Sequence, residues 1–254
     1  MKPRRGSTAV LAVLALGAGL WASTGASVAA KPPSGIDVSR FQGKIKWNRV
    51  ARAGVDFAFV QASRGSGFDC ATAPDRCGAD EFYLRNYARA RHFGIRVGPY
   101  HRAFSGGETI ADVTADALAE ADLFIFQVGE LQSGDLRPAL DVETPFGGLN
   151  ATELQTWIRT WLGRVEDALG HKPIIYTNNS SWQATGNTTE FALAGDPLWV
   201  AHWGVIAPTV PASFWAGNGW SAWQYSSSGH VRGIKGRVDL DRLGPAGFEP
   251  LGIP

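Results

Sequence analysis

The chain has 254 residues, and its 24 Lys and Arg residues nearly balance its 23 Asp and Glu residues, giving a formal charge of +1. Without residues 1–30 it keeps 21 basic and 23 acidic residues, a charge of −2. A charge this close to zero gives no electrostatic reason to bind nucleic acid or an anionic membrane. The remaining length suits one large domain, of the size of an α/β barrel.

The first 30 residues follow the order of a secretory signal peptide. Lys2, Arg4 and Arg5 make a basic start, residues 9–22 are almost entirely apolar, and small residues follow. A membrane anchor is the alternative, but the apolar run is shorter than the roughly 20 residues that a spanning helix needs. We therefore expect cleavage near residue 30, a secreted protein without membrane attachment, and one mature domain over 31–254.

Two cysteines, Cys70 and Cys77, lie close together in the sequence. In an exported protein, two nearby cysteines indicate a disulfide, which here would pin the short segment 68–78. A metal site would need more soft ligands nearby, and a catalytic thiol would need a His partner. We therefore expect a structural disulfide, with no metal and no cofactor.

Short apolar runs bounded by Gly and Pro recur up to about residue 180. Runs of this length are typical of buried parallel strands. We expect such strands at 35–39, 57–61, 95–100, 138–143 and 173–177.

Helical patterns lie between these strands. Apolar residues from Leu154 to Leu169 follow one helix face. Asn150 and Glu153 resemble a capping box at its start, and Gly170 is a plausible stop. A second helical pattern runs over 110–128. Alternating strands and helices predict parallel strands joined by crossover helices.

The pattern changes after about residue 180. Strand-like segments recur at 198–203, 220–225 and 237–243, and the intervening segments are rich in Gly, Pro and Ser. We therefore predict an α/β fold: an irregular, eight-stranded TIM-like barrel in which five β/α units are followed by three strands with few helices.

Two carboxylates, Asp141 and Glu143, stand at the end of the fourth expected strand. Side chains at positions i and i+2 of a strand share one face, and the carboxyl ends of barrel strands open onto the active site. Cleavage of a glycosidic bond needs such a pair, one protonated and one ionised. Burial and like charge would raise one pKa and leave the other group ionised. A solvated loop pair or a salt bridge is the alternative interpretation.

Two further acids support the catalytic interpretation. Asp37 follows an apolar residue in the first expected strand, and Asp239 does so in the last. Each alone is also consistent with a strand-end turn. In a closed barrel, however, the first and eighth strands are neighbours, which would bring both acids to the rim that holds Asp141 and Glu143.

Aromatic residues are abundant in the second half of the mature chain. Trp199, Trp203, Trp220 and Trp223 lie in strand-like segments beside polar residues such as His202 and Gln224. Flat apolar rings beside hydrogen-bonding groups suit a carbohydrate groove. Core packing is the alternative for at least half of these Trp residues, and we expect it for the two on the helix face, Trp157 and Trp161.

Eight segments in order resemble glycoside hydrolase family 25, the Chalaropsis-type lysozymes. They read IDVSRFQG at 36–43, FVQAS at 59–63, GPYH at 98–101, LDVE at 140–143, IYTN at 175–178, LWVAHW at 198–203, WQY at 223–225 and VDLD at 238–241. The resemblance spans essentially the whole mature chain. It implies an N-acetylmuramidase that cuts the β-1,4 bond between N-acetylmuramic acid and N-acetylglucosamine, with peptidoglycan strands as the partner and a monomer as the default state.

The resemblance also implies roles for individual residues. Glu143 is expected to be the general acid, and Asp141 either the nucleophile or the group that orients the substrate's own N-acetyl group. Asp37 and Asp239 are expected to tune pKa values and to hold sugar hydroxyls, and Tyr176 to bond the acetamido oxygen. The remaining expected substrate-binding residues are Tyr100, His101, Trp203, Trp223 and Gln224.

Two features depart from the family pattern. Members often carry Asn at the position of Asp241, which lies two residues past Asp239 and could face the same side. The segment 68–78, with its cysteines, is typical of a subgroup and could shape the rim of the groove.

Three rival interpretations remain. A chitinase-like barrel would carry additional acids before Asp141, where the chain reads LRPAL at 136–140. A non-catalytic barrel that binds cell-wall carbohydrate would not need the intact pair of Asp141 and Glu143. A zinc amidase or peptidase would need ligand spacing such as H-E-x-x-H, which the five His residues lack.

Overall fold

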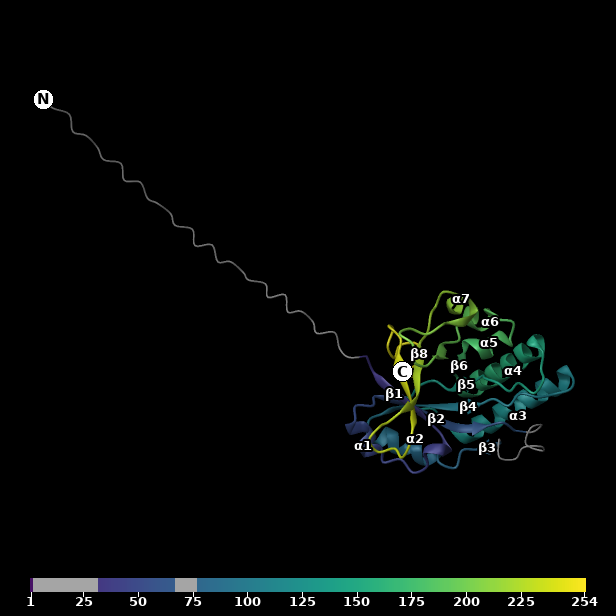
Figure 1. Cartoon of the computed structure of the whole chain (residues 1–254), viewed down its shortest axis with the longest axis horizontal. Helices are drawn as coiled ribbons and strands as arrows, with labels where there is room; N and C mark the ends of the chain where they lie inside the picture. The colour runs from purple at the N-terminus through teal and green to yellow at the C-terminus, as the bar shows by residue number, and fades with distance from the viewer. Residues whose placement is uncertain (2–31, 67–76) are drawn as a thin grey trace. The chain divides into compact units, whose positions relative to one another are not determined.

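A closed barrel of eight strands forms the centre of the fold (Figure 1). The structure, a computed structural model, describes Met1 and residues 32–66 and 77–254. The barrel strands are β1 (Ser34–Val38), β2 (Phe57–Arg64), β4 (Arg96–Arg102), β5 (Ala139–Asp141), β6 (Ile174–Asn178), β7 (Leu198–Ala201), β8 (Ala222–Gly229) and β9 (Val238–Leu243). All eight overlap the expected strand segments, so the predicted barrel is confirmed.

The strand order is β1-β9-β8-β7-β6-β5-β4-β2, and pairing of β1 with β2 closes the circle. Neighbouring barrel strands from β1 to β8 are parallel, whereas β9 runs antiparallel to both β8 and β1. A parallel pair needs a crossover connection of a dozen or more residues. The segment between β8 and β9, residues 230–237, is too short for that. A short additional strand, β3 (Gly78–Ala79), pairs antiparallel with the last two residues of β2.

Helices follow the early strands as expected. They are η1 (Arg40–Gln42), α1 (Trp47–Arg52), α2 (Tyr83–His92), α3 (Ile110–Val128) and α4 (Ala151–Leu169). The Asn150 side chain caps α4 by accepting a hydrogen bond from the backbone N–H of Glu153. The Glu153 carboxylate in turn accepts one from the backbone N–H of Asn150. Gly170 ends this helix in a left-handed conformation, with φ 73°. The predicted boundaries of α4 are therefore confirmed.

The second half of the barrel carries only short helices. They are α5 (Asn179–Gln183), α6 (Glu190–Ala194) and α7 (Pro211–Ala216). In α7, the backbone of residues 212–216 is left-handed, with φ between 51° and 59°. The change of pattern predicted near residue 180 is therefore a real change from long to short connections.

Apolar residues pack into two separate clusters. One fills the barrel, where Phe59 stacks on Trp199 with ring centroids 4.1 Å apart. The other lies between the barrel and the helices and includes Trp157 and Trp161, both fully buried. The expectation that these two Trp residues belong to a core is confirmed.

The C-terminal segment closes the end of the barrel at which the parallel strands begin. Leu251 is fully buried in the interior cluster, and the Phe248 ring packs edge-on against Phe57 with centroids 5.9 Å apart. A bridge between Leu136 and Gly252 fixes this segment to the chain before β5. Only the opposite end, at the carboxyl ends of the parallel strands, is therefore left to hold a polar site.

Two expectations concern parts of the chain that the structure does not fully describe. The signal peptide and Cys70 lie outside the described residues, so cleavage and the Cys70–Cys77 disulfide stay predictions; Cys77 is not a free cysteine. Within residues 32–66 and 77–254, no helix is long and apolar enough to span a bilayer.

Candidate active site

A pocket of about 230 Å³ opens at the carboxyl ends of the parallel strands. It takes side chains from all eight barrel strands and from segments that follow some of them. Its lining residues are Asp37, Ser39, Phe41, Gln61, Arg64, Tyr100, Arg102, Phe104, Asp141, Glu143, Tyr176, Trp199, Gln224 and Asp239. The four expected catalytic acids are all among them.

Strand pairing brings two of these acids together. Asp37 of β1 stands opposite Asp239 of β9 in the antiparallel register, and residues directly opposite each other share a face of the sheet. Asp241 lies two residues further along β9 and is fully buried, where its Oδ1 accepts from the Trp199 Nε1–H at 2.8 Å. Asp241 does not line the pocket, so it forms a layer beneath Asp37 and Asp239.

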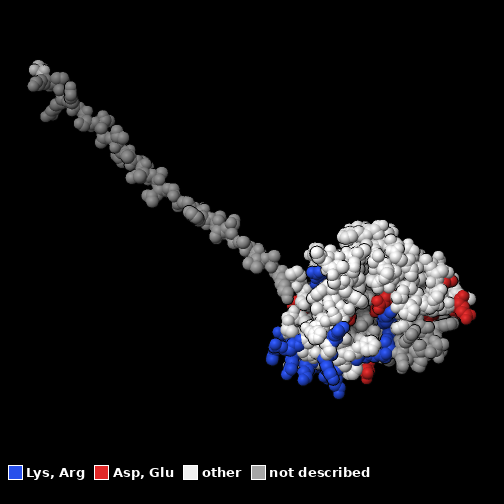
Figure 2. Space-filling model, viewed as in Figure 1, with Lys and Arg blue, Asp and Glu red and all other residues white. Residues whose placement is uncertain are grey.

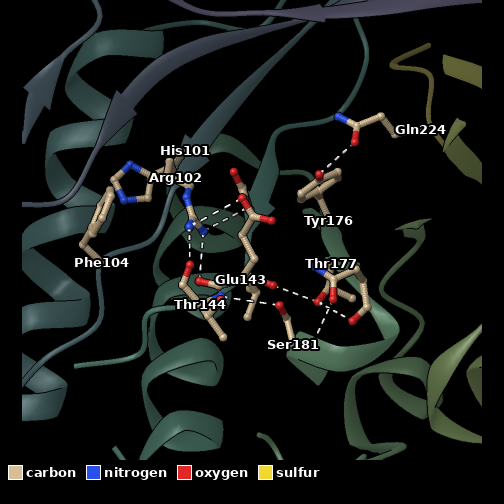
Figure 3. A network of polar contacts seen from close by, with 12 residues as sticks. His101, Arg102, Phe104, Glu143, Thr144, Tyr176, Thr177, Ser181 and Gln224 are labelled. Atoms are coloured by element: carbon tan, nitrogen blue, oxygen red, sulfur yellow. Dashed lines mark hydrogen bonds and ion pairs between the residues drawn. The ribbon is translucent and has the colours of Figure 1, made fainter. Parts of the chain in front are cut away.

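Arg102, at the end of β4, holds the other two acids. Its Nη1 donates to Asp141 Oδ1 at 3.2 Å and to the Glu143 carbonyl at 3.0 Å, and its Nη2 lies 3.5 Å from Glu143 Oε1. Figure 3 shows this guanidinium facing Glu143 and Thr144, whose carbonyl accepts from Nη2 at 2.9 Å. One cation therefore fixes both the strand end and the loop that carries the second carboxylate.

The backbone around Glu143 is also held from the other side. The Thr177 hydroxyl donates to the Val142 carbonyl at 2.8 Å, and the Thr144 N–H donates to the Ser181 hydroxyl at 3.4 Å (Figure 3). The Asp141 side chain is 10% exposed and that of Glu143 is 32% exposed. Glu143 is thus the more accessible carboxylate of the pair.

Gln224 of β8 connects three sides of the pocket. Its Nε2 donates to Asp37 Oδ2 at 2.7 Å. Its Oε1 accepts from the Tyr176 hydroxyl at 3.0 Å and from the Trp203 Nε1–H at 2.8 Å (Figure 3). Because two donors face Oε1 and a carboxylate faces Nε2, the amide has only one satisfactory orientation.

Aromatic rings form the floor of the pocket. Trp199 packs edge-on against Tyr176 and Tyr100, with centroids 4.5 Å and 6.2 Å away. Its indole N–H bonds the buried Asp241, so the ring is fixed by packing and by a hydrogen bond. A sugar ring entering the pocket would meet an apolar floor surrounded by carboxylates.

Burial and crowding shift the acid pKa values. Burial raises the pKa of Asp37 well above its ordinary value, and the negative charges of Asp241 and Asp239 raise it further. Burial also raises the pKa of Asp141 well above its ordinary value, and the charge of Arg102 opposes that rise. The pKa of Asp239 is raised by burial too. The site can therefore retain protons at pH values where free carboxylates have lost them.

His101 does not line this pocket, so its expected substrate-binding role is wrong. It is fully buried on the outer face of the sheet, where Ser63 Oγ lies 2.8 Å from its Nδ1 and Glu120 Oε2 lies 2.6 Å from its Nε2. Its ring stacks on Trp161. Burial lowers the pKa of His101 to about 3. Because Tyr100 faces inward, the next residue along the strand must face outward.

The expected substrate-binding role of Trp223 is wrong for the same reason. It precedes the inward-facing Gln224, is 2% exposed and belongs to the cluster between barrel and helices. Its Nε1–H donates to the His202 carbonyl, and the Arg242 guanidinium lies 3.8 Å from its ring centroid. Trp223 therefore supports the wall of the barrel and does not touch the pocket.

Trp203 lies on the rim, beside a second pocket of about 450 Å³. Its ring is 53% exposed, and this pocket is lined by Asn178, Asn179, Ser180, Ala201, His202, Trp203 and Thr209. The hydrogen bond from Trp203 to Gln224 joins the second pocket to the first.

Sequence reasoning missed Arg102, Arg64, Gln61, Phe41 and Phe104, which all line the pocket. Arg102 could have been found from strand alternation, since it lies two residues beyond Tyr100. Phe41 lies in the short helix η1 and Phe104 in a loop, and strand alternation gives no signal for either. Among the residues that the structure describes, no group of three or more His, Cys, Asp or Glu side chains is arranged to hold a metal ion.

Comparisons with known proteins agree on one family. The model of Glycosyl hydrolases family 25 matches residues 36–234. Lysozyme M1 of Streptomyces globisporus is 35% identical over 216 residues, covering 82% of this chain and 67% of that protein. The N,O-diacetylmuramidase of Chalaropsis sp is 31% identical over 222 residues, covering 81% of this chain and 95% of that protein. The crystal structure of the bacterial lysozyme from Streptomyces coelicolor superposes with a TM-score of 0.70 at 34% identity, covering 85% of this chain and 93% of that one.

Proposed function

The chain belongs to glycosyl hydrolases family 25, and on this premise we propose that it is a secreted muramidase. It hydrolyses the β-1,4 bond between N-acetylmuramic acid and N-acetylglucosamine in peptidoglycan. Relatives named lysozyme and N,O-diacetylmuramidase support the substrate class. The observation that carries the proposal is the pair of Asp141 and Glu143, held by Arg102 at the mouth of a pocket that accommodates little more than one sugar ring.

Glu143 is the general acid in this proposal. It is the more exposed member of the pair and stands in the loop beyond β5, where it can reach the bridging oxygen of a bound glycan. It donates a proton to the leaving oxygen as the glycosidic bond breaks and later takes a proton from water. Its loop is fixed by Arg102 and Thr177, so the carboxyl group needs little reorganisation during the reaction.

Asp141 stabilises the positive charge that develops on the sugar carbon. Two routes are open to it: attack on that carbon, or orientation of the substrate's acetamido oxygen for the same attack. Arg102 keeps its charge close to Asp141 and favours the ionised form, whereas burial disfavours it. The positive charge that develops on the sugar carbon would shift this balance toward the ionised carboxylate.

The remaining pocket residues position the sugar. Asp37 and Asp239 accept hydrogen bonds from sugar hydroxyls, and Gln224 keeps Asp37 in place. Tyr176 and Tyr100 both pack against Trp199, and the ring of the sugar lies over this aromatic floor. The Tyr176 hydroxyl lies within the same network and can turn toward the acetamido oxygen.

The second pocket extends the site along the rim. Its lining carries no Lys, Arg, Asp or Glu, and the half-exposed face of Trp203 suits the apolar face of a neutral sugar. A glycan strand that enters the first pocket would pass over Trp203 to this second pocket.

The test of this function is to digest purified peptidoglycan and identify the new reducing ends by mass spectrometry. New N-acetylmuramic acid ends are expected. New N-acetylglucosamine ends would instead identify a glucosaminidase. Binding without any new ends would identify a non-catalytic wall-binding barrel.

Export is tested separately. N-terminal sequencing of protein recovered from the medium should begin close to residue 31. A chain that begins at Met1 and sediments with membranes would reject cleavage and support an anchor. Sedimentation equilibrium of the same material is expected to give the mass of a monomer.

A further inference from the structure

Basic residues are concentrated in three segments that contain no acid at all. The segments are 44–52, 82–96 and 227–238, and they hold eleven of the 24 Lys and Arg residues of the chain. The first covers α1, the second covers α2, and the third is the turn between β8 and β9. The near-neutral total charge therefore hides a strong local excess of positive charge.

The three segments pack together into one surface, which we call the basic face. The Trp47 Nε1–H of α1 donates to Asn86 Oδ1 of α2 at 3.0 Å. The Lys46 N–H donates to the carbonyl of Gly233, in the β8–β9 turn, at 2.9 Å. A side chain at position 233 would come within 3.0 Å of Arg49 Cβ, so the turn lies directly on α1. Figure 2 shows Lys and Arg gathered where Figure 1 labels α1 and α2.

Most of these cations have no acidic partner, although Arg89 and Arg96 lie over the rings of Phe93 and Phe248. Ten of the eleven are exposed, and none of those ten forms a salt bridge with a described residue. The eleventh, Arg91, pairs with Asp135. The ten exposed cations are Lys44, Lys46, Arg49, Arg52, Arg85, Arg89, Arg96, Arg232, Lys235 and Arg237.

The opposite pattern holds around α3 and α4. Between Arg102 and Arg137 the chain has seven acids and no Lys or Arg. The cations that lie on and just after α4 are paired, Arg159 with Glu190, Arg164 with Asp122 and Lys172 with Glu166. Among the residues that the structure describes, exposed Lys and Arg side chains without a salt bridge are therefore found on the basic face alone.

We propose that the basic face binds an anionic phosphodiester polymer of the bacterial cell wall. This proposal rests on the proposed function, which places the enzyme at peptidoglycan, to which such polymers are attached. Regularly spaced phosphates would meet a row of Lys and Arg over two helices and a turn. The attraction extends over roughly 8–10 Å at ordinary ionic strength, so it gathers enzyme at the wall without a shaped pocket.

Two other polyanions fit the face less well. Single-stranded nucleic acid is bound through exposed aromatic rings, but those of the three segments are buried or half-buried. An anionic membrane would favour an apolar stripe among the cations. The three segments expose one large hydrophobic side chain, that of Leu84.

The basic face also borders the catalytic pocket. The Gln42 side chain donates from Nε2 to the Arg237 carbonyl at 3.3 Å, and its neighbour Phe41 lines the pocket. Polymer bound on the basic face would therefore hold the pocket mouth close to the glycan to which the polymer is attached.

The test compares two triple variants with the same loss of charge. The first, K46Q/R49Q/R52Q, removes three unpaired cations from the basic face. The second, R159Q/R164Q/K172Q, removes three cations that are already paired with acids, two on α4 and one just after it. Binding is measured by sedimentation with walls that carry the phosphodiester polymer and with walls from which hydrofluoric acid has removed it. Thermal melting checks that both variants are folded.

We expect the first variant to bind polymer-bearing walls at least tenfold more weakly, and the second to bind like the wild type. Wild-type binding should fall steeply as salt is raised, and stripped walls should show little of it. Hydrolysis of soluble glycan fragments should be the same in all three proteins. Equal binding to stripped walls, equal loss in both variants, or tighter binding to phosphatidylglycerol vesicles or to a polynucleotide would each overturn the proposal. If soluble fragments are not cleaved at all, the proposed function fails, while the binding comparison still decides this inference.

Discussion

The two ends of the barrel are made by the same strands and hold opposite chemistry. At the carboxyl ends of the parallel strands, Asp37, Asp141 and Asp239 surround a pocket floored by Trp199. At the other end, Phe248 and Leu251 fill the interior with apolar side chains. The crowded carboxylates at the first end destabilise the folded state, and the apolar side chains buried at the other end stabilise it. Substitutions at the first end should therefore change mainly activity, and those at the second mainly stability.

The largest effect is expected at the polar end, from Glu143→Gln. This change keeps the shape and removes the proton, and loss of general acid catalysis typically costs about 10²–10⁴-fold in rate. The loss should shrink for an activated aryl glycoside, whose leaving group needs little protonation. Asp141→Asn should not be rescued in this way, because it removes charge stabilisation at the sugar carbon. Steady-state kinetics on wall and on the aryl substrate make the measurement.

Circular dichroism and wall pull-down serve as controls for both variants. Rescue of Asp141→Asn and not of Glu143→Gln by the activated substrate would reverse the two roles. Full wall-lysing activity in both variants would show that this pair is not the catalytic site.

At the apolar end, Leu251→Ala is expected to lower stability and leave activity per folded molecule unchanged. Leu251 is fully buried, and truncation of such a residue typically costs about 2–5 kcal/mol. Leu193→Ala, at a side chain that is 75% exposed, is the matched control and should cost little. Urea denaturation gives the free energy of unfolding. A loss of kcat below the unfolding midpoint would mean that the two ends are coupled.

The carboxylate layer beneath the pocket should make stability depend on pH. Burial raises the pKa of Asp241 well above its ordinary value, and the charge of Asp239 adds to the rise. The folded state therefore holds this proton more tightly than the unfolded chain, whose Asp pKa is about 3.9. The stabilising contribution of the protonated Asp241 is complete at pH values below the unfolded-state pKa. It is lost as pH rises through the folded-state pKa.

Asp241→Asn should remove this loss of stability at high pH. The variant is expected to melt higher than the wild type at pH 7–8 and to lose the advantage near pH 4, with about 2–4 °C for each kcal/mol in a domain of this size. Asp239→Asn, at a more exposed position, should show the smaller change. A parallel downward shift of the Asp241→Asn melting curve at every pH would indicate lost packing instead of a removed charge.

The smallest effect is expected from Trp203→Phe. The variant keeps an aromatic ring and loses the N–H that Gln224 Oε1 accepts at 2.8 Å. One hydrogen bond is worth about 1 kcal/mol, or roughly fivefold in kcat/KM. Trp220→Phe makes the same change beside a pocket at the apolar end and should leave kcat/KM unchanged. Equal kinetics for the two variants would mean that the orientation of Gln224 does not depend on Trp203.

The sequence predicted the barrel and its acids well because both depend on simple rules. Apolar runs marked the eight strands, and the carboxyl ends of parallel strands converge, which brought Asp37, Asp141 and Glu143 into one pocket. The antiparallel direction of β9 was not predicted, although the short segment before it excludes a parallel crossover.

The errors have two physical causes. His101 was assigned to the site because it follows a strand, and Trp223 because its ring lies in a strand-like segment beside polar residues. Neighbouring residues in a strand face opposite sides, however, and Tyr100 and Gln224 take the inward positions. The total charge sums the basic face and the acidic region around α3 and α4, which have opposite signs, so it did not indicate the basic face. Only the packing of α1, α2 and the β8–β9 turn reveals that these cations share a surface.

The pairing of β1 with β9 also decides how the chain can be extended. Ser34 lies opposite Arg242, and the segment that follows β9 packs with Leu251 at the closed end of the barrel, so both ends of the barrel domain lie at that end, away from the pocket. A partner domain fused to either end would therefore not cover the mouth of the site. Because both ends lie at the same end of the barrel, the fold is a candidate for circular permutation, with a linker joining the present ends and new ones opened in an exposed connection.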